Sequence, residues 1–482
     1  MSGEVSLVSN PLVARHRLNL NQLTNLSRRF HQSAVVWSWT FNALRLASGL
    51  ILLPLLVRTL SVPDLGMYYV FMSLVALLPL VDFGFSTTIG RYISYAMAGA
   101  EELKPQGMVT IEEHRPPNYQ LLWQLLGTTR GLYRSLSLLA LVLVGVTGSF
   151  TVGYRVQETT APTITWVAWG ITLVSEIWGM YSCWWGVFLM GMNQVMLANR
   201  LLVLAHSVKL VIAAGLLLAG GGLLSLPTAS LICGLLQRQL ARRVCLARLP
   251  AQESLPPITK PAASLLPIIW PNSWRLGLQL VTGYLSSNLN TFICLSWFGL
   301  AANAEYGLSV QVFSIIAGVS AVWTNVKWPA VGQYRTRGDY GGLQHLLRPR
   351  VWLLLATITG GSLVTIFLLP DMLRWLGSDK RVLPVGWLAL LALNTWLASN
   401  YTFWGTLIST ENRMPYIWPA IATNFVSLGL ALALVQFSSF GLGALVLAPL
   451  IAGSLCNYWY WPLVAPWSIR TTWWKFMFAR AK

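Results

Sequence analysis

The chain has 482 residues, of which 55% are hydrophobic and only 10% are charged. So few charges cannot cover the surface of a soluble domain, so the composition excludes a soluble protein and indicates an integral membrane protein. The net charge of +18 would suggest nucleic-acid binding in a soluble protein, but in a membrane protein basic residues hold loops in the cytoplasm and contact anionic lipid. We therefore expect membrane lipids, and not nucleic acid, as partners.

Residues 1–33 are polar and basic, contain no secretory signal, and are predicted to form a cytoplasmic N-terminal segment. Apolar runs of about 20 residues follow, which match the thickness of a bilayer and indicate helices rather than a barrel. The sequence therefore predicts an all-α integral membrane fold of about twelve transmembrane helices. The predicted spans are 34–56, 67–90, 131–150, 164–189, 196–219, 221–237, 273–297, 304–328, 351–370, 382–408, 414–436 and 441–464.

The basic residues predict the orientation of these spans. With the amino terminus inside, the inner segments hold 24 of the 33 Lys and Arg residues, the outer loops hold five, and four lie within the spans. Cytoplasmic loops of membrane proteins carry such an excess. We expect a multi-pass protein of the cell (cytoplasmic) membrane with both termini in the cytoplasm.

A proline-rich segment, 249–267, interrupts the chain near its middle and is predicted to be a cytoplasmic linker. It would separate an N-terminal six-helix bundle, 34–248, from a C-terminal six-helix bundle, 268–465, arranged around a central cavity. The basic and aromatic residues 466–482 would form an interfacial tail. The two halves show weak internal sequence similarity. The segments "PDLGMYYVFMSL" (63–74) and "AEYGLSVQVFSI" (304–315) both place an acid two residues before a glycine. Such repeats are typical of transporters.

Arg45 lies halfway along the first span, where a charge facing lipid would be costly. Ser38, Asn42, Arg45, Ser48 and Gly49 follow helical spacing and form one polar or small stripe. The arginine is therefore predicted to face protein or water. Since the other faces are apolar, Asn42 and Arg45 are candidate substrate-binding residues.

The seventh span repeats this pattern at the equivalent place in the second half. Its stripe comprises Arg275, Gln279, Thr282, Ser286 and Asn290, spaced by four, three, four and four residues. Two polar stripes at equivalent positions predict a hydrated cavity between the halves. Arg275, Gln279 and Asn290 join the substrate-binding candidates.

Four other ionisable residues lie within the spans: Asp82, Glu176, Lys209 and Lys327. Lys327 is near an inner end and is predicted to extend to the interface. By helical rise, Arg45 and Asp82 could meet, and Glu176 and Lys209 fall at similar depth. Two interpretations stay open: Lys209 binds substrate and the acids couple transport to an ion, or these groups form buried ion pairs that hold helices together.

Motifs for ATP hydrolysis, zinc-dependent hydrolysis and Ser/His/Asp catalysis do not occur in the sequence. The cysteines are scattered and form neither a CxxC motif nor a metal-ligand spacing with histidine, and Glu112, Glu113 and His114 on a loop are interpreted as solvated. We expect no metal, no cofactor and no enzyme activity. The five cysteines are Cys183, Cys233, Cys245, Cys294 and Cys456.

The stretch "LLVRTLSVPDLGMYYVFMSLVALLPLVDFGFSTTIGRYIS" (55–94) has an "RTL" step at the end of an apolar helix, an acid–x–Gly turn, a helix closing on "DFG", and an arginine beyond it. It resembles the polysaccharide-transporter branch, the lipid-linked oligosaccharide flippases, of the multidrug/oligosaccharidyl-lipid/polysaccharide (MOP) exporter superfamily. The specific part covers about 40 residues, and the twelve-span plan extends the likeness over 34–465.

The resemblance implies alternating access that moves a polyprenyl-pyrophosphate-linked oligosaccharide from the inner to the outer leaflet. It also implies cationic residues in the cavity, for which Arg45 and Arg275 are suitable. The energy could come from H⁺ or Na⁺ acting on Glu176 or Asp82, or from removal of the glycan outside. A polysaccharide polymerase and a chain-length regulator are candidate partners. From the residues, arginine suits a pyrophosphate because it can donate two parallel hydrogen bonds. Side chains available for the sugars are Asn288, Asn290, Asn394, Asn400, Trp396 and Tyr401.

Three other functions remain as alternatives. A drug/cation antiporter has the same plan but needs an acidic cavity, whereas the spans carry four bases against two acids, or three with Glu305. A membrane glycosyltransferase would use an acid such as Asp64 on the first outer loop, but that loop is short. A peptidoglycan-precursor flippase would use the same chemistry as the predicted flippase.

Overall fold

A computed structural model describes residues 34–101, 103, 116–250, 265–325, 327–336, 338–375, 377–410 and 415–478. These residues form helices and connecting turns, with no strand among them. The predicted N-terminal segment 1–33, most of the predicted linker 249–267, and Glu112 to His114 lie outside them. Within the described part, eight helical stretches are long and apolar enough to cross a membrane by themselves.

The first half of the chain supplies six crossings, of which four (α2, α6, α9 and α10) are single helices and two are broken. The second span comprises α3, α4 and α5, and the fourth comprises α7 and α8, while the short 3-10 helices η1 and η2 lie between crossings. The elements are α2 (Ala34–Thr59), α3 (Val62–Val75), α4 (Leu78–Asp82), α5 (Phe85–Met97), α6 (Tyr119–Arg155), η1 (Val156–Glu158), α7 (Pro162–Ser182), α8 (Trp184–Gly191), α9 (Val195–Leu218), η2 (Gly222–Leu224) and α10 (Ser225–Leu246).

The second half begins with α11, which contains the seventh and eighth spans joined at Gly299. Gly299 has a φ of 80°, a left-handed conformation that side chains disfavour, and it reverses the chain there. The elements are α11 (Leu266–Asn325), α12 (Trp328–Thr336), α13 (Tyr340–Trp375), α14 (Val385–Ser409), α15 (Ile417–Phe437), α16 (Gly443–Leu455), α17 (Asn457–Val464), η5 (Ala465–Ile469) and α18 (Trp473–Phe478).

The predicted spans each coincide with one of these helical segments, so the all-α membrane fold with about twelve crossings is confirmed. The observed helices extend further than several spans, most of all α6 and α13. Sequence analysis placed span ends where hydrophobicity fell, but a helix continues past the bilayer while its backbone bonds are satisfied. Predicted ends therefore fell short where polar turns follow the apolar ones.

The second crossing is broken at Phe83 and Gly84, next to Asp82. Both residues have left-handed φ values, 48° and 79°, and Phe83 is one of three described residues other than glycine with a positive φ. Phe83 stacks on Trp270 of α11 with ring centroids 6.0 Å apart, and its ring lies against Gly277. The contact with α11 compensates for the unusual backbone at this break.

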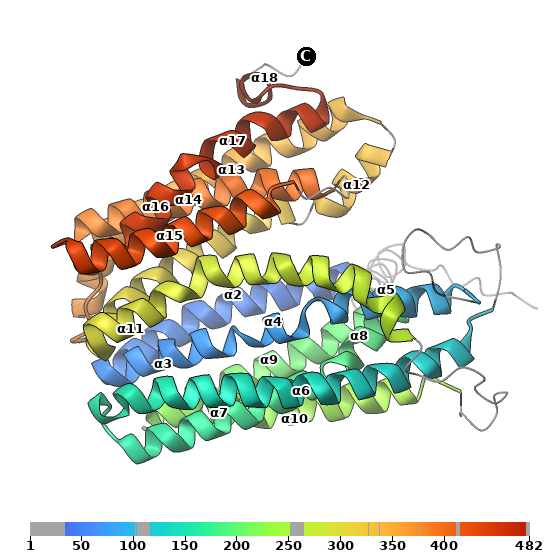
Figure 1. Ribbon diagram of the computed structural model, residues 1–482, viewed down its shortest axis with the longest axis horizontal. Coiled ribbons are helices and arrows are strands. Elements are labelled where there is room, and N and C mark those ends of the chain that lie inside the picture. Colours follow the sequence, from blue (N-terminus) through green and yellow to red (C-terminus); the bar gives the residue numbers. More distant parts are fainter. Residues whose placement is uncertain are drawn as a thin grey trace, which may run out of the picture.

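Helix α11 lies between the two groups of helices (Figure 1), with α2 to α10 on one side and α12 to α18 on the other. Its first half follows the first group: the Tyr92 hydroxyl donates to the Ile268 carbonyl at 3.0 Å, and the Tyr284 hydroxyl donates to the Ser73 carbonyl at 3.2 Å. Helices α13, α14 and α15 also pack against α11. The division of the chain into bundles at 249–267 stays a prediction.

Contacts between the groups gather at one end of the molecule, which the basic residues predict to be outside; we call it the predicted outer end. Gly66 on α3 meets the backbone of Leu300 so closely that an added Cβ would collide with the Leu300 carbonyl. The Asn303 amide donates to the Gly66 carbonyl at 2.9 Å. Tyr69 packs over Gly307 and donates its hydroxyl to the Gln311 amide oxygen at 2.6 Å.

A second set of contacts at this end involves η1. Arg155 donates to Glu158 at 2.5 Å and to the Ser296 carbonyl at 3.0 Å. Glu158 in turn accepts the Leu300 backbone N–H at 3.0 Å, next to the reversal at Gly299. The loop after α6 is thus tied to the turn inside α11, and the first group of helices is packed against the second half of α11 here.

Part of the predicted tail folds back onto the second group of helices. Phe476 of α18 is buried against Trp404, with ring centroids 5.2 Å apart. Arg348 on α13 donates to the backbone carbonyls of Phe476 and, at 2.8 Å, Lys475. The described part of the tail is therefore packed against protein, while Trp474 and Phe478 remain exposed.

Candidate functional site

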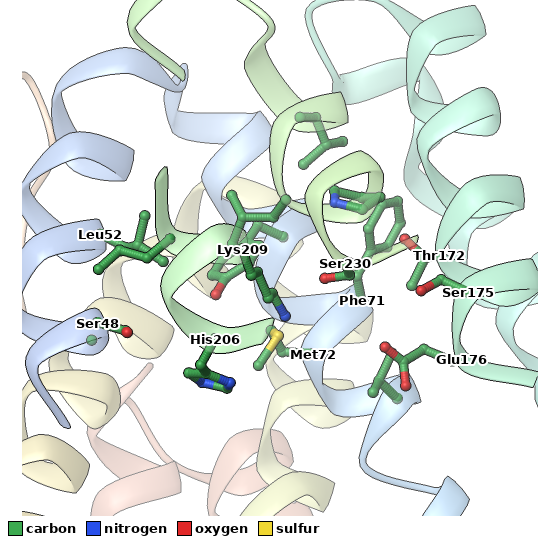
Figure 2. Close-up of a pocket in the computed structure, with 17 residues that line it drawn as sticks. Ser48, Leu52, Phe71, Met72, Thr172, Ser175, Glu176, His206, Lys209 and Ser230 are labelled. Carbon is green, nitrogen blue, oxygen red and sulfur yellow. The ribbon is translucent and has the colours of Figure 1, made fainter. Parts of the chain in front are cut away.

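A cavity of about 270 Å³ lies among α2, α3, α7, α9 and α10 (Figure 2). Glu176 from α7 and Lys209 from α9 point into it from opposite sides, with His206 one turn before Lys209. Ser48, Thr172, Ser175 and Ser230 add hydroxyl groups, and Leu52, Phe71 and Met72 supply apolar walls. We call this space the first-half cavity.

Glu176 and Lys209, predicted to lie at similar depth, are brought together by the fold. The charges of Glu176 and Lys209 lie close enough to interact electrostatically, and Arg238 is a second base that interacts with Glu176. Within the described part of the chain, Glu176 and Lys209 form no direct ion pair. Because both line open space, a charged or polar group could bind between them.

Sequence reasoning missed two members of this group, His206 and Arg238. Arg238 lies just beyond the predicted span 221–237, but α10 continues to Leu246 and so includes it. The Arg238 guanidinium packs against Gly179 and Gly234, where an added Cβ would lie within 2.8 Å of a guanidinium nitrogen. The glycines leave room for the guanidinium. A "GxxxR" spacing between Gly234 and Arg238 on a helix was the available signal, although a weak one.

Asp82 lines two adjoining cavities of about 660 and 670 Å³, the first of which also has Glu176 and Arg238 in its wall. Its carboxylate accepts hydrogen bonds from the Tyr133 hydroxyl and, at 2.8 Å, from the Ser86 hydroxyl. Asp82 and Arg45 form no ion pair in the described structure. The break after Asp82 places Ser86 where it can reach back to the carboxylate.

Arg45 and Asn42 lie on an exposed side of α2, outside the wall of the first-half cavity. The Asn42 amide donates to the Ser38 carbonyl at 2.9 Å along its own helix. Arg45 and Lys209 both interact electrostatically with His206, which lines the cavity. Arg45 is therefore a further base close to this cavity. On the adjacent face, a Cβ at Gly49 would lie 3.6 Å from Ile315 of α11.

A cavity of about 500 Å³ lies in the second half of the chain, between α11, α14, α15, α16 and α17. Amides and phenols line it, among them Asn394, Tyr401, Asn457 and Tyr458, and none of its described lining residues is ionisable as an acid, lysine, arginine or histidine. Gly283 of α11 borders both this second-half cavity and the cavity beside Asp82. The two chemical environments therefore meet at one residue of α11.

Several other candidate residues have structural contacts. The Asn290 amide donates to the Leu445 carbonyl at 3.0 Å and so joins α11 to α16. Asn400 is buried and accepts from Trp404, while Asn288 borders the cavity beside Asp82. Lys327 lies in the turn after α11. Arg275 and Gln279 lie on α11, but their side chains are outside the described residues.

Asp64, the acid that the alternative glycosyltransferase would use, makes hydrogen bonds that hold the start of α3 in place. Ser61 caps α3 by accepting the Asp64 N–H at 3.2 Å, and the Asp64 carboxylate accepts the Thr160 N–H at 3.2 Å. An acid in the first turn also favours a helix N-terminus. These bonds tie α3 to the loop after η1.

No protein-family model and no curated protein matches the chain. Solved structures do match. An inward-facing multidrug resistance MATE family transporter of the MOP superfamily superposes with a TM-score of 0.60 and 16% identity, covering 91% of this chain and 100% of that one. An outward-facing structure of a MATE transporter of this superfamily gives 0.55 and 13%, covering 92% and 99%.

A MOP superfamily transporter from Pyrococcus furiosus Vc1, whose binding pocket is described as having reverse polarity, gives a TM-score of 0.55 and 13% identity, covering 92% of this chain and 96% of that one. At such identities the likeness concerns the fold. The chain therefore has the fold of MATE transporters of the MOP superfamily, which agrees with the superfamily predicted from residues 55–94.

Proposed function

We propose that this protein is a transporter of the cytoplasmic membrane that moves a polyprenyl-pyrophosphate-linked oligosaccharide from the inner to the outer leaflet by alternating access. The observation that carries the proposal is the division of polar chemistry across α11. Bases and two acids gather beside the first-half cavity, and uncharged amides and phenols line the second-half cavity. A cargo with an anionic pyrophosphate and a neutral glycan needs both kinds of surface.

The first-half bases suit the pyrophosphate. A diphosphate cannot enter hydrocarbon without losing its hydration, and cationic side chains in a site of low dielectric replace that hydration. Arg45 and Arg275 are the proposed contacts, and Lys209 and Arg238 line two cavities that share Glu176. Arginine is suited to the task because its planar fork donates two parallel hydrogen bonds to phosphate oxygens.

The contacts at the predicted outer end support an alternating-access cycle. In this structure α3, η1 and α11 are in contact at that end, and with the predicted orientation we infer that this is the closed side of a state open toward the cytoplasm. The TM-score is higher with the inward-facing MATE structure than with the outward-facing one. Opening requires these contacts to separate, and a cargo moves the equilibrium only by binding the two states differently.

A drug/cation antiporter is the second candidate. Two observations favour it: Asp82 and Glu176 line cavities, and the structural neighbours include multidrug transporters. Each acid, however, has other groups near it, since Asp82 accepts hydroxyl bonds and Glu176 faces Lys209 and Arg238. A proton or sodium ion acting on either acid could drive either kind of transport.

The test is reconstitution in vesicles with two fluorescent probes, a polyprenyl-pyrophosphate-linked sugar and the lipophilic cation rhodamine 6G. We expect the wild-type protein to flip the first, and Arg45→Ala and Arg275→Ala each to slow flipping by about tenfold or more, as the loss of a charge-assisted bidentate contact implies.

Arg374→Ala is the matched control, because Arg374 is exposed and pairs only with the exposed Asp371 in the described structure. Its rate should equal the wild-type rate. Flipping at the wild-type rate in both test variants would contradict the role of the arginines. Transport of rhodamine 6G without flipping of the lipid would favour the antiporter.

A further inference from the structure

We propose that the second-half cavity binds the sugar portion of the cargo and that it does so through uncharged groups on α14, α15 and α17. The inference rests on the proposed flippase function and adds a separate subsite for the glycan to it. The cavity volume of about 500 Å³ lies within the range of ligand sites, roughly 300–1,000 Å³.

The chemistry of the lining matches a sugar. Amides and hydroxyls can both donate and accept, as sugar hydroxyls do, and aromatic rings pack against the C–H faces of sugars. Tyr401, Tyr416 and Tyr458 supply three phenol rings, and Asn394 and Asn457 supply amides. A charged cargo would be left there without a counter-charge among the described lining residues, which makes burial of a charge unfavourable.

The amides are held in fixed orientations before any ligand arrives. Tyr458 donates its hydroxyl to the Asn394 amide oxygen at 2.7 Å, which turns the Asn394 NH₂ group away from that bond. Asn457 donates to Thr423 at 2.8 Å and accepts from Trp461 at 3.0 Å. Preorganised polar groups bind with a smaller loss of conformational entropy.

Hydrogen-bonding capacity remains for a ligand. Neither the Asn394 NH₂ group nor the Tyr401 hydroxyl donates a hydrogen bond within the described part of the chain. Thr402 and Thr406 donate along their own helix, at 2.8 Å in each case, so their oxygens can still accept. These groups lie on successive turns of α14 and face one space.

The second-half cavity adjoins the 670 Å³ cavity beside Asp82, which in turn adjoins the 660 Å³ cavity that has Arg238 in its wall. Gly283 borders both this cavity and the one beside Asp82, and an added Cβ there would meet nothing within 4 Å. Gly283 itself places no side chain between the two spaces, and we infer that a long molecule occupies both. A pyrophosphate on the side of Asp82 and the first-half bases would leave its attached sugars beside α14.

The test uses the purified full-length protein and two probes from the same source. The first is the lipid-linked glycan pool extracted from the membranes of the native cells, and the second is that pool after mild acid, which hydrolyses the sugar–phosphate bond and leaves polyprenyl pyrophosphate. Binding of each is titrated by intrinsic tryptophan fluorescence. We compare the double variant Tyr401→Phe/Thr406→Val with Thr359→Val/Tyr460→Phe.

The control pair makes the same chemical changes outside the cavity. Thr359 donates along α13 at 2.8 Å as Thr406 does along α14, and Tyr460 is exposed on α17. We expect the cavity variant to bind the glycan-bearing pool about tenfold more weakly, the effect of two lost neutral hydrogen bonds. Its affinity for the sugar-free lipid should be unchanged, and the control should match the wild type for both.

Other outcomes separate the two proposals. Equal weakening for both probes, or none for the glycan-bearing pool, would overturn the sugar subsite while leaving the flippase function intact. If the wild-type protein binds neither probe, both proposals are overturned. Arg45→Ala serves as the reference for the pyrophosphate contact, because it should weaken both probes alike.

Discussion

Glu176 and Lys209 line a cavity among membrane-spanning helices without forming a direct ion pair, which is an expensive arrangement for a purely structural role. A buried structural pair is stabilising only when the charges are in contact and their remaining hydrogen bonds are satisfied. Here both groups line open space, and Arg238 and His206 lie close by. The arrangement is better suited to a group that gains or loses a partner during the cycle.

We predict that Glu176 and Lys209 are energetically coupled across this space. Glu176→Gln and Lys209→Met should each lower the free energy of unfolding, because each leaves the other charge with fewer opposite neighbours. The double variant should be less destabilised than the sum, with a coupling on the order of 1 kcal/mol. The measurement is a double-mutant cycle of urea unfolding in mixed micelles.

The comparison pair is Asp371→Asn and Arg374→Met, whose side chains are 68% and 78% exposed. Exposed pairs contribute little, so this second cycle should show almost no coupling. Additive effects in the Glu176 and Lys209 cycle would show that the two groups act independently.

At the scale of elements, three of the helices that line the cavities are ones that hydrophobicity identifies poorly. Helices α7, α10 and α14 are not among the stretches apolar enough to span alone. Glu176 lies on α7, Arg238 on α10, and Asn394 and Tyr401 on α14. These cavity-lining residues contribute to the lower hydrophobicity of the three helices.

The approach of α3 to α11 depends on two glycines, Gly66 and Gly307, which occupy equivalent places in the weak internal repeat. Gly66 allows contact with the Leu300 backbone, and Gly307 lies under the Tyr69 ring. The repeat was noticed in the sequence as an acid–x–Gly pattern, but its purpose is visible only in the packing. Each glycine brings its own helix against the other half of the chain.

We predict that Gly66→Ala shifts the protein toward the state that is open at the predicted outer end. The new Cβ would collide with the Leu300 carbonyl, and backbone cannot move aside as a flexible side chain can. The measurement is the distance between spin labels at Thr160 and Arg374 in a background without native cysteines, and the mean distance should increase.

Gly215→Ala on α9 is the matched control, since an added Cβ there meets nothing within 4 Å. Its distance distribution should equal that of the parent protein. An unchanged distribution for Gly66→Ala, in a variant that still folds, would show that this contact does not hold the end closed.

For the whole molecule, the orientation in the membrane decides which way the closed end faces. The basic residues predict cytoplasmic termini, and the contacts of α3, η1 and α11 then close the outer side. The proposed direction of flipping depends on this orientation. An opposite orientation would place the open side toward the exterior.

We predict that cysteines introduced at Thr160 and Thr472 differ in accessibility in intact cells. In a background without native cysteines, an impermeant maleimide should label Thr160→Cys, which is exposed on the loop after η1. Thr472→Cys, exposed before α18, should react only after the membrane is permeabilised. The reverse pattern would overturn the predicted topology and the assignment of the outer end.

The sequence by itself determined the class of protein, the placement of the twelve crossings and the candidate charges. These follow from local properties: the length of an apolar run, the spacing of a stripe and the cost of a charge in lipid are all read along one helix. Asp82, Glu176 and Lys209 could therefore be singled out before any contact was known.

Only the tertiary structure decided which of these groups meet. Arg238 lines the cavity beside Asp82 and Glu176 because α10 continues further than its apolar run and Gly179 leaves space on a neighbouring helix. Asp82 bonds to Tyr133 and Ser86 because the helix breaks at Phe83. Contacts between distant segments depend on how helices cross and where they break, and a pattern along one helix contains no information about the face of another.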